Sequence, residues 1–185
     1  MRIFSAIFAS LLAQGMSVTG AHAWDLNPYI GVSYNVVDIE AKELIGVSPK
    51  NHSASTQVGI SLTPYFGLEA EWGNVSEPVG ETVNGVDISV DITKAIGLYA
   101  NATLPLTERL SVYGRAGGIT AATETTFTAP GVGRLEVDDN LDGYSVGVGT
   151  TYDLTKRIAL RGFYTRAEFS NAATNTFSLG SIWRF

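Results

Sequence analysis

The sequence predicts an all-β protein: an eight-stranded antiparallel up-and-down transmembrane β-barrel that follows a cleaved signal peptide. Three observations predict this fold. Apolar residues alternate with polar or small residues through most of the chain, which is the periodicity of β-strands. Connections between the alternating runs are short and long in turn, as in a meander. The polar face of the runs is mostly Gly, Ser, Thr and Asn, whereas a face in contact with water is rich in Lys, Glu and Asp.

The composition excludes several classes of protein. The chain has 185 residues, 45 % hydrophobic and 16 % charged, so it is too apolar for a disordered protein and carries less charge than the roughly 25 % of a typical soluble domain. A formal net charge of −6 without any run of Lys or Arg excludes nucleic acid as a partner, because binding phosphates needs clustered cations. The absence of Cys excludes disulfides, thiolate metal sites and a Cys nucleophile.

Residues 1–23 have the layout of a secretory signal peptide. Arg2 precedes an apolar stretch from Ile3 to Ala13, and small and polar residues then lead to an A-x-A-like cleavage site that ends at Ala23. We therefore expect residues 24–185 to form the exported barrel domain. No later segment has the roughly 18 consecutive apolar residues of a transmembrane helix, so strands have to make any membrane crossing.

Eight alternating runs follow the signal peptide. In the first run Ile30, Val32, Tyr34 and Val36 share one face, and small or polar residues such as Ser33 share the other. The other seven runs repeat this pattern. Their apolar faces extend over Thr56 to Leu62, Leu68 to Trp72, Ile88 to Ala102, Leu110 to Ala116, Tyr144 to Tyr152, Ile158 to Tyr164 and Phe177 to Phe185.

The connections fall into two classes by length. Short links are predicted at residues 63–66, 104–109 and 153–157, longer ones near 38–54, 74–87 and 121–141, and a modest one near 168–174. Two of the short links have similar sequences, which are Leu106-Thr107-Glu108-Arg109-Leu110 and Leu154-Thr155-Lys156-Arg157-Ile158. This weak repeat indicates hairpins of up-and-down order, in which the short turns share one end of the barrel.

The polar face indicates which side of the barrel is outside. Its small residues suit a narrow interior, because eight strands leave a lumen that side chains fill. Four charged residues lie on this inward face at comparable heights: Glu69, Glu71, Arg115 and Arg161. We expect them to neutralise one another and fix strand register; the alternative is that they form a gate for ions.

The apolar face carries the features of a lipid-facing surface. Aromatic residues gather toward the ends of the runs, as in the aromatic girdles of membrane barrels; Tyr34, Trp72, Tyr144, Tyr164 and Phe177 lie nearer the long loops. Lys94 is the one charged residue on this face. Its position near the interface on the long-loop side predicts contact with lipopolysaccharide phosphates.

The whole mature chain resembles, as a pattern, the small outer-membrane barrels of the OmpA transmembrane-domain, OmpX and Ail type. The compact motif of this resemblance is an alternating final strand that ends in Trp183-Arg184-Phe185. In that family such an end is similar to the signal read by the barrel assembly machinery. Ser181 departs from the apolar residue usual at its place. The resemblance implies a bacterial outer-membrane location, with the termini periplasmic and the long loops extracellular.

Candidate chemistry is sparse. His52 is the one histidine after the signal peptide, so a His-dependent triad would need this loop residue. The segment from Glu168 to Ala172 resembles the catalytic segment of the PagL lipid A deacylase, but Glu168 stands where that family has its histidine, so Ser170 lacks a general base. The acidic segment 136–142 includes half of a calcium-loop pattern and leaves open a loose divalent-cation site. We expect no cofactor and no enzymatic activity.

Function is expected in the long connections. Asn84-Gly85 is a strong two-residue hairpin signal, and a second hairpin turns at Pro130-Gly131. Both hairpins are expected to continue beyond the bilayer as a projecting sheet, whose edge and apolar residues suit strand addition by a host-surface or serum protein. The sequence therefore favours a structural or adhesin-like surface protein. A narrow pore and a lipid A-modifying enzyme remain the alternatives.

Overall fold

The computed structural model describes residues 26–41, 50–75, 79–83, 86–129, 133–170 and 172–185. All regular secondary structure in these residues is β-strand. No helix in the described part of the chain is long and apolar enough to cross a membrane. The strands are β1 (Asn27–Ala41), β2 (Lys50–Ser61), β3 (Phe66–Val75), β4 (Val79–Val83), β5 (Val86–Pro105), β6 (Leu110–Ala129), β7 (Gly133–Asp153), β8 (Ile158–Phe169) and β9 (Ala172–Arg184).

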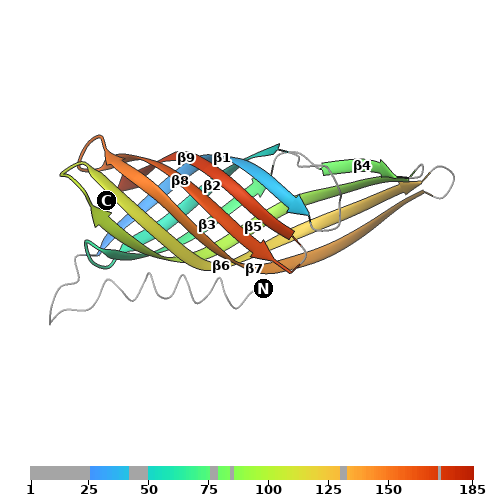
Figure 1. Ribbon diagram of the computed structural model, residues 1–185, viewed down its shortest axis with the longest axis horizontal. Coiled ribbons are helices and arrows are strands. Elements are labelled where there is room, and N and C mark those ends of the chain that lie inside the picture. The colour runs from blue at the N-terminus through green and yellow to red at the C-terminus, as the bar shows by residue number, and fades with distance from the viewer. Residues whose placement is uncertain (1–25, 42–49, 76–78, 84–85, 130–132, 171) are drawn as a thin grey trace.

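The sheet closes on itself as a barrel of eight antiparallel strands. Its strand order is β3-β2-β1-β9-β8-β7-β6-β5-β4, and β3 also pairs with β5. This last pairing closes the barrel, and β4 lies outside it as a short extra strand on β5 (Figure 1). The predicted eight-stranded meander is thus confirmed, with β4 as an additional strand that pairs with β5.

The alternation of the sequence corresponds to the two faces of the barrel wall. In β1, for example, Val32 is 56 % exposed on the outer surface, whereas the neighbouring Ser33 is 6 % exposed and faces the lumen. The same alternation continues in β8, where every second residue from Ala159 to Phe169 is buried. Large apolar side chains therefore lie outside, and small or polar ones inside, as the composition of the polar face predicts.

The three short turns share one end of the barrel and one geometry. In each turn a Thr side chain accepts hydrogen bonds from two backbone N–H groups, two and three residues further on. The Leu before each Thr donates its N–H across the turn to the first residue of the next strand. The Thr residues are Thr63, Thr107 and Thr155, so the weak sequence repeat corresponds to a repeated turn stabilised by a side-chain hydroxyl.

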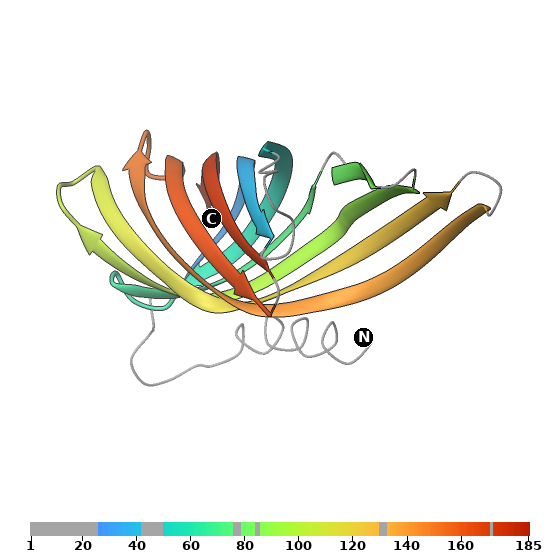
Figure 2. The same ribbon diagram turned by 45° about the vertical axis from the view of Figure 1, so that its right-hand side comes forward.

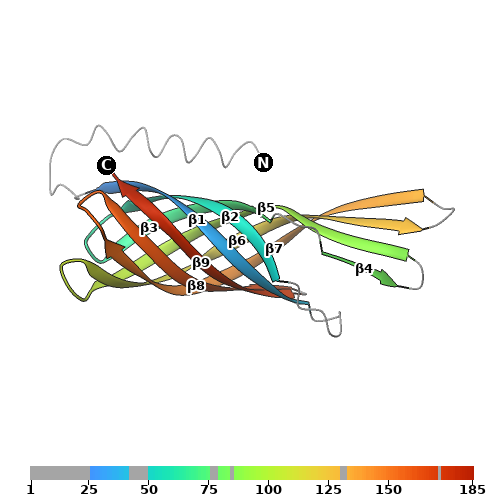
Figure 3. The same cartoon turned by 90° about the horizontal axis from the view of Figure 1, so that it is seen from above.

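Three strands extend well beyond the others at the opposite end. β5 has 20 residues, β6 has 20 and β7 has 21, whereas β8 has 12. Figures 2 and 3 show these strands, with β4 beside β5, projecting past the ends of β1, β8 and β9. We call the part formed by residues 79–83, 86–93, 120–129 and 133–142 the projecting sheet. The hairpin turns expected at Asn84-Gly85 and Pro130-Gly131 lie outside the described residues.

Three expectations from the sequence are wrong in detail. The positions from Ile88 to Ala102 do not share one face, because a β-bulge between Ile92 and Lys94 shifts the register against β6 by one residue. The link expected near 168–174 is much shorter, since β8 ends at Phe169 and β9 begins at Ala172. The acidic segment 136–142 is not a loop; it lies within β7 and is paired with β6 throughout.

Candidate functional site

The four charged residues predicted on the inward face meet in the middle of the lumen. Arg115 Nη1 of β6 lies 3.1 Å from Glu69 Oε1 and 2.7 Å from Glu71 Oε2, both on β3. Arg161 Nη1 of β8 forms an ion pair with Glu69 Oε2. Glu69 therefore bridges a guanidinium group of β6, two strands away around the barrel, and one of β8 on the opposite side. Two carboxylates and two guanidinium groups make this cluster neutral.

The side chain of Arg115 is fixed by hydrogen bonds and by two aromatic rings. Its Nε and Nη2 donate hydrogen bonds to Thr165 Oγ1 at 3.2 and 2.8 Å. Its guanidinium carbon lies 4.3 Å from the ring centre of Tyr99 and 4.4 Å from that of Phe163. A guanidinium between two aromatic faces is stabilised by cation–π attraction, which is stronger away from water. Arg115 is therefore fixed in the position that neutralises both glutamates.

Tyrosine rings complete the cluster around Arg161. Tyr29 Oη donates a 2.6 Å hydrogen bond to Glu69 Oε2. The guanidinium carbon of Arg161 lies 4.7 Å from the ring centre of Tyr113 and 5.2 Å from that of Tyr29. No described residue accepts a hydrogen bond from Arg161 Nε. Tyr29 is 5 % exposed, and its ring fills part of the barrel interior.

Sequence reasoning missed the uncharged half of the cluster. Gln57 Nε2 donates a 3.1 Å hydrogen bond to Glu71 Oε1, and Ser55 Oγ donates one of 2.6 Å to the same oxygen. Gln57 is 1 % exposed and also donates to Ser33 Oγ at 2.7 Å. The alternation along the strand places these residues on the inward face, so the sequence did indicate that they face the lumen. Their contacts with Glu71 depend on the stagger of the strands, which the sequence does not show.

The interior differs above and below the charge cluster. Toward the projecting sheet an apolar cluster of Ala121, Ala167 and Phe169 fills the space. Toward the short turns lies a cavity of about 330 Å³, lined by residues from all eight barrel strands and reaching Arg161 and Tyr113. Side chains thus fill the middle and the long-loop end of the lumen. This arrangement suits neutralisation and strand register better than an ion gate, because the guanidinium groups occupy the lumen itself.

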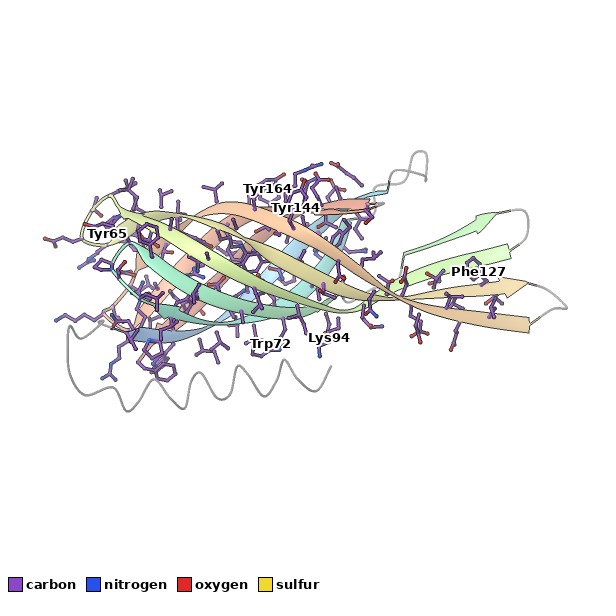
Figure 4. All side chains as sticks on the ribbon, turned by 90° about the horizontal axis from the view of Figure 1, so that it is seen from below. Tyr65, Trp72, Lys94, Phe127, Tyr144 and Tyr164 are labelled. Carbon is purple, nitrogen blue, oxygen red and sulfur yellow. The ribbon has the colours of Figure 1, made fainter. Side chains whose placement is uncertain are left out.

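The outer surface has an apolar belt bounded by aromatic and polar residues. Trp72 is 44 % exposed, Tyr144 63 % and Phe177 64 %, and all three lie toward the long-loop end of the belt. Lys94 is exposed and lies two residues beyond Ile96, the residue of β5 that is opposite Trp72 (Figure 4). A lipopolysaccharide contact stays a prediction.

A polar rim follows directly above the aromatic residues. Arg166 Nε donates a 2.6 Å hydrogen bond to Glu168 Oε1, and its Nη1 donates one of 3.1 Å to Asn175 Oδ1. Asn175 Nδ2 donates to Glu40 Oε1 at 2.7 Å. Tyr164 Oη also donates to Asn175 Oδ1, at 2.6 Å. The outward-facing side chains change from aromatic to charged or polar between one cross-strand pair and the next. This change marks the edge of the lipid-facing belt.

The residues considered for catalysis come from β2 and from the end of β8, which are not neighbours in the sheet. Glu168 is hydrogen-bonded to Arg166 on the outer face, and Ser170 is exposed just after the end of β8. His52 Nδ1 lies 2.7 Å from Tyr34 Oη, and the two rings are stacked. Among the described residues no group of three His, Asp or Glu side chains is placed to hold a metal ion.

The projecting sheet has two chemically different faces. The bulge brings Ile88 of β5 opposite Phe127 of β6, and Phe127 is opposite Leu135 of β7, so one row carries three apolar residues. On the other face one row is acidic, because Asp138 of β7 is opposite Glu124 of β6. Figure 4 shows Phe127 within this sheet, far from the short-turn end marked by Tyr65.

Comparisons with known proteins agree with this geometry. The sequence model of the outer membrane protein beta-barrel domain matches residues 6–185. The fold is similar to Ail from Yersinia pestis, with a TM-score of 0.64, 14 % identity and coverage of 86 % of this chain and 99 % of Ail. It is also similar to Neisserial surface protein A, with a TM-score of 0.62, 14 % identity and coverage of 85 % and 97 %.

A third similar structure is OprG from Pseudomonas aeruginosa, with a TM-score of 0.53, 13 % identity and coverage of 86 % and 95 %. No curated protein is detectably similar to the chain. Identities this low show a shared fold, whereas the family match extends over nearly the whole sequence. The chain therefore belongs to the outer membrane protein beta-barrel domain family, as an eight-stranded barrel of the bacterial outer membrane.

Proposed function

We propose that this barrel is a surface protein whose projecting sheet captures an extended segment of another protein by strand addition. One observation carries the proposal. Along Gly133–Asp142 strand β7 pairs with β6 on one side, and no described strand pairs with its other side, because pairing with β8 begins at Gly143. An edge strand with unused backbone N–H and C=O groups is a template for another strand.

The length and exposure of this edge support the proposal. Ten residues exceed the length of a typical β-strand, about 5 to 6 residues, so an added strand would find a complete partner. Leu135 and Val137 are 63 % and 46 % exposed beside the edge, and apolar side chains at such positions give an added strand its side-chain contacts. The filled lumen is then the scaffold that carries this sheet.

The proposal includes an orientation and a route of assembly. Short turns of outer-membrane barrels face the periplasm and longer loops face outward, so the projecting sheet would lie on the cell surface. Residues 1–23 would be removed on export. Trp183 and Phe185 would act as the signal for the barrel assembly machinery, and Lys94 would contact lipopolysaccharide.

Host or serum proteins are the proposed partners. Among proteins with a similar fold, Ail has been solved in complex with the heparin analogue sucrose octasulfate. That ligand belongs to Ail, and it supports a surface-binding role for barrels of this shape without naming the partner of this chain. The narrow-pore and lipid A-modifying alternatives have less support, because side chains occupy the lumen and Ser170 has no histidine beside it in sequence.

A pair of proline variants tests strand addition. Successive residues of a strand direct their N–H groups to opposite sides, so one of Val137→Pro and Asp138→Pro removes an N–H on the open side while the other removes a bond to β6. Bacteria displaying each variant would be tested for adhesion to cultured host cells and retention of serum proteins. We expect the variant that lacks the N–H group on the open side to lose binding. Hydrogen exchange in β6 of that variant should stay at the wild-type rate. Binding by both variants at the wild-type level would refute the proposal.

Conductance and lipid chemistry test the alternatives directly. Current through the purified protein in planar bilayers would support the pore. Release of fatty acid from lipid A by the wild type, abolished in Ser170→Ala, would support the enzyme. We expect neither result.

A further inference from the structure

The cavity at the short-turn end of the lumen presents guanidinium groups. It has a volume of about 330 Å³ and extends from the first short turn to Arg161 and Tyr113 beside the charge cluster. The charged residues among its described lining residues are Arg161 and Arg184, and none of these lining residues is a carboxylate. Glu69 and Asp153 form the ion pairs with these two arginines from outside the lining.

Two hydrogen-bond donors at the inner end of this cavity have no partner among the described residues. Arg161 uses Nη1 for its ion pair with Glu69, and its Nε donates to no described group. The hydroxyl of Tyr113 is also unpaired, and its ring centre lies 4.7 Å from the guanidinium carbon of Arg161. Both side chains are more than nine-tenths buried. An unpaired buried donor is unfavourable, so an acceptor bound in the cavity would be stabilised here.

A third unpaired group at the same end is an acceptor. Tyr29 gives its single hydroxyl proton to Glu69, so the side-chain amide of Asn101 has to be the donor in its 3.3 Å contact with Tyr29 Oη. This contact assigns the amide orientation and leaves Asn101 Oδ1 as the atom without a described partner. Asn101 lines the cavity from β5, and Tyr113 lines it from the neighbouring β6. A complementary occupant accepts from Arg161 and Tyr113 and donates to Asn101.

The charges around the cavity favour an anion. Both oxygens of Glu69 already accept from two guanidinium groups and a phenol, which weakens the repulsion between Glu69 and an anion. The side chains of the three short turns carry more cations than carboxylates, and such an excess attracts anions from solution. These side chains are Arg109, Lys156 and Arg157 against Glu108, all exposed.

We propose that this cavity binds a small oxyanion that retains one O–H group, of which hydrogen phosphate is the simplest example. Its charged oxygens would accept from Arg161 Nε and Tyr113 Oη, and its O–H would donate to Asn101 Oδ1. Sulfate has a similar shape but no O–H group, so one of its oxygens would face Asn101 Oδ1 without a proton between them. Water is the competing occupant. This inference concerns the end of the barrel opposite the projecting sheet and does not depend on strand addition.

Calorimetric titration of the purified barrel tests the proposal. The protein is kept in a maltoside detergent, which contributes no phosphate. The probes are inorganic phosphate, sulfate and glycerol 3-phosphate at about pH 6, where phosphate and much of its monoester retain an O–H group. We expect saturable binding of phosphate, with sulfate weaker by about tenfold or more. Tighter binding of glycerol 3-phosphate would support the same site and identify a phosphorylated organic molecule as its occupant.

Three variants locate the bound ion. Tyr113→Phe removes the hydroxyl but keeps the ring beside Arg161, and it should weaken phosphate binding by about fivefold. Asn101→Ala removes the acceptor and should bring phosphate and sulfate to equal affinity. Tyr152→Phe makes the same chemical change on the outer surface, where Tyr152 is 45 % exposed, and should leave phosphate binding unchanged. The change of gel mobility on boiling shows that each variant forms a closed barrel.

Three results would overturn the proposal. Phosphate that does not bind the wild-type barrel saturably would show that the cavity holds only water. Equal wild-type affinities for phosphate and sulfate would show that no O–H group is required. Phosphate binding at the wild-type level in both Tyr113→Phe and Asn101→Ala would place the ion on surface cations instead. Because none of these experiments involves the β7 edge, their failure would leave strand addition intact.

Discussion

Tyr29 Oη donates a 2.6 Å hydrogen bond to Glu69 Oε2 across 40 residues of sequence. The same oxygen forms the ion pair with Arg161. One carboxylate thus receives a phenol and a guanidinium on one oxygen and Arg115 on the other. These four residues come from β1, β3, β6 and β8, so the contact depends on a fully closed barrel. The central cluster therefore forms only when the barrel closes, and its presence indicates a closed barrel.

Glu69→Gln should strongly destabilise the barrel. The substitution leaves two buried guanidinium groups with one carboxylate between them, and removing one partner of a buried ion pair typically costs about 3 to 5 kcal/mol. Glu71→Gln is the matched control and should cost clearly less, because the side chain of Glu71 is 14 % exposed and that of Glu69 is fully buried. Urea unfolding in lipid vesicles, followed by tryptophan fluorescence, measures both. Equal losses would contradict the central role assigned to Glu69.

Gly59→Ala should destabilise the barrel by overpacking. A Cβ added at Gly59 would lie 2.1 Å from Cζ of Tyr29, whose ring covers this glycine from the neighbouring strand. Overpacking of this kind costs about 1 to 3 kcal/mol. The double variant Tyr29→Leu with Gly59→Ala should lose less than the sum of the two single changes. A strictly additive double-variant cycle would show that ring and glycine do not interact.

Thr155→Val should weaken the last short turn. The substitution keeps the shape of the side chain but removes the oxygen that accepts from the N–H groups of Arg157 and Ile158. We expect a loss of about 1 kcal/mol in the free energy of unfolding, the usual contribution of such a bond. Thr155→Ser keeps the acceptor and should recover most of the loss in the same urea experiment.

Phe185→Ser should reduce assembly in cells more than stability in vitro. If Phe185 is read by the barrel assembly machinery, less protein should reach the outer membrane in the form whose gel mobility changes on boiling. Refolding of the purified variant into detergent should stay near the wild-type yield. Leu106→Ser removes another exposed apolar side chain at the short-turn end and serves as the control. An equal effect of both variants in cells would remove the special role of the C-terminal residue.

Lys94→Ser should weaken retention of lipopolysaccharide. Lys94 lies beyond Trp72 at the long-loop edge of the lipid-facing belt, where an ammonium group attracts anionic headgroups by about 1 kcal/mol, or roughly fivefold in affinity. Native mass spectrometry of the barrel with bound lipid A measures the loss. Lys156→Ser, in a short turn at the other end, should leave lipid A binding unchanged.

The bulge between Ile92 and Lys94 shows where prediction from sequence failed. The alternation from Ile88 to Ala102 reads as continuous, and a continuous strand would place Ile88 and Ile96 on one face. One extra residue in β5 changes the phase, so Ile88 instead joins Phe127 and Leu135. Nothing local distinguishes a bulge from a regular strand here, because the requirement comes from pairing with β6.

The sequence by itself determined the eight crossing strands, the outward direction of the apolar residues, the shared end of the short turns and the four inward charges. These follow from the period of two residues and from turn chemistry, both of which are local. The tertiary structure decided which residues meet: Tyr29 with Glu69, Thr165 with Arg115, and the acidic row that ends at Asp138. Such contacts depend on strand stagger and barrel closure, which bring together residues that are far apart in the chain. A local sequence pattern therefore does not predict them.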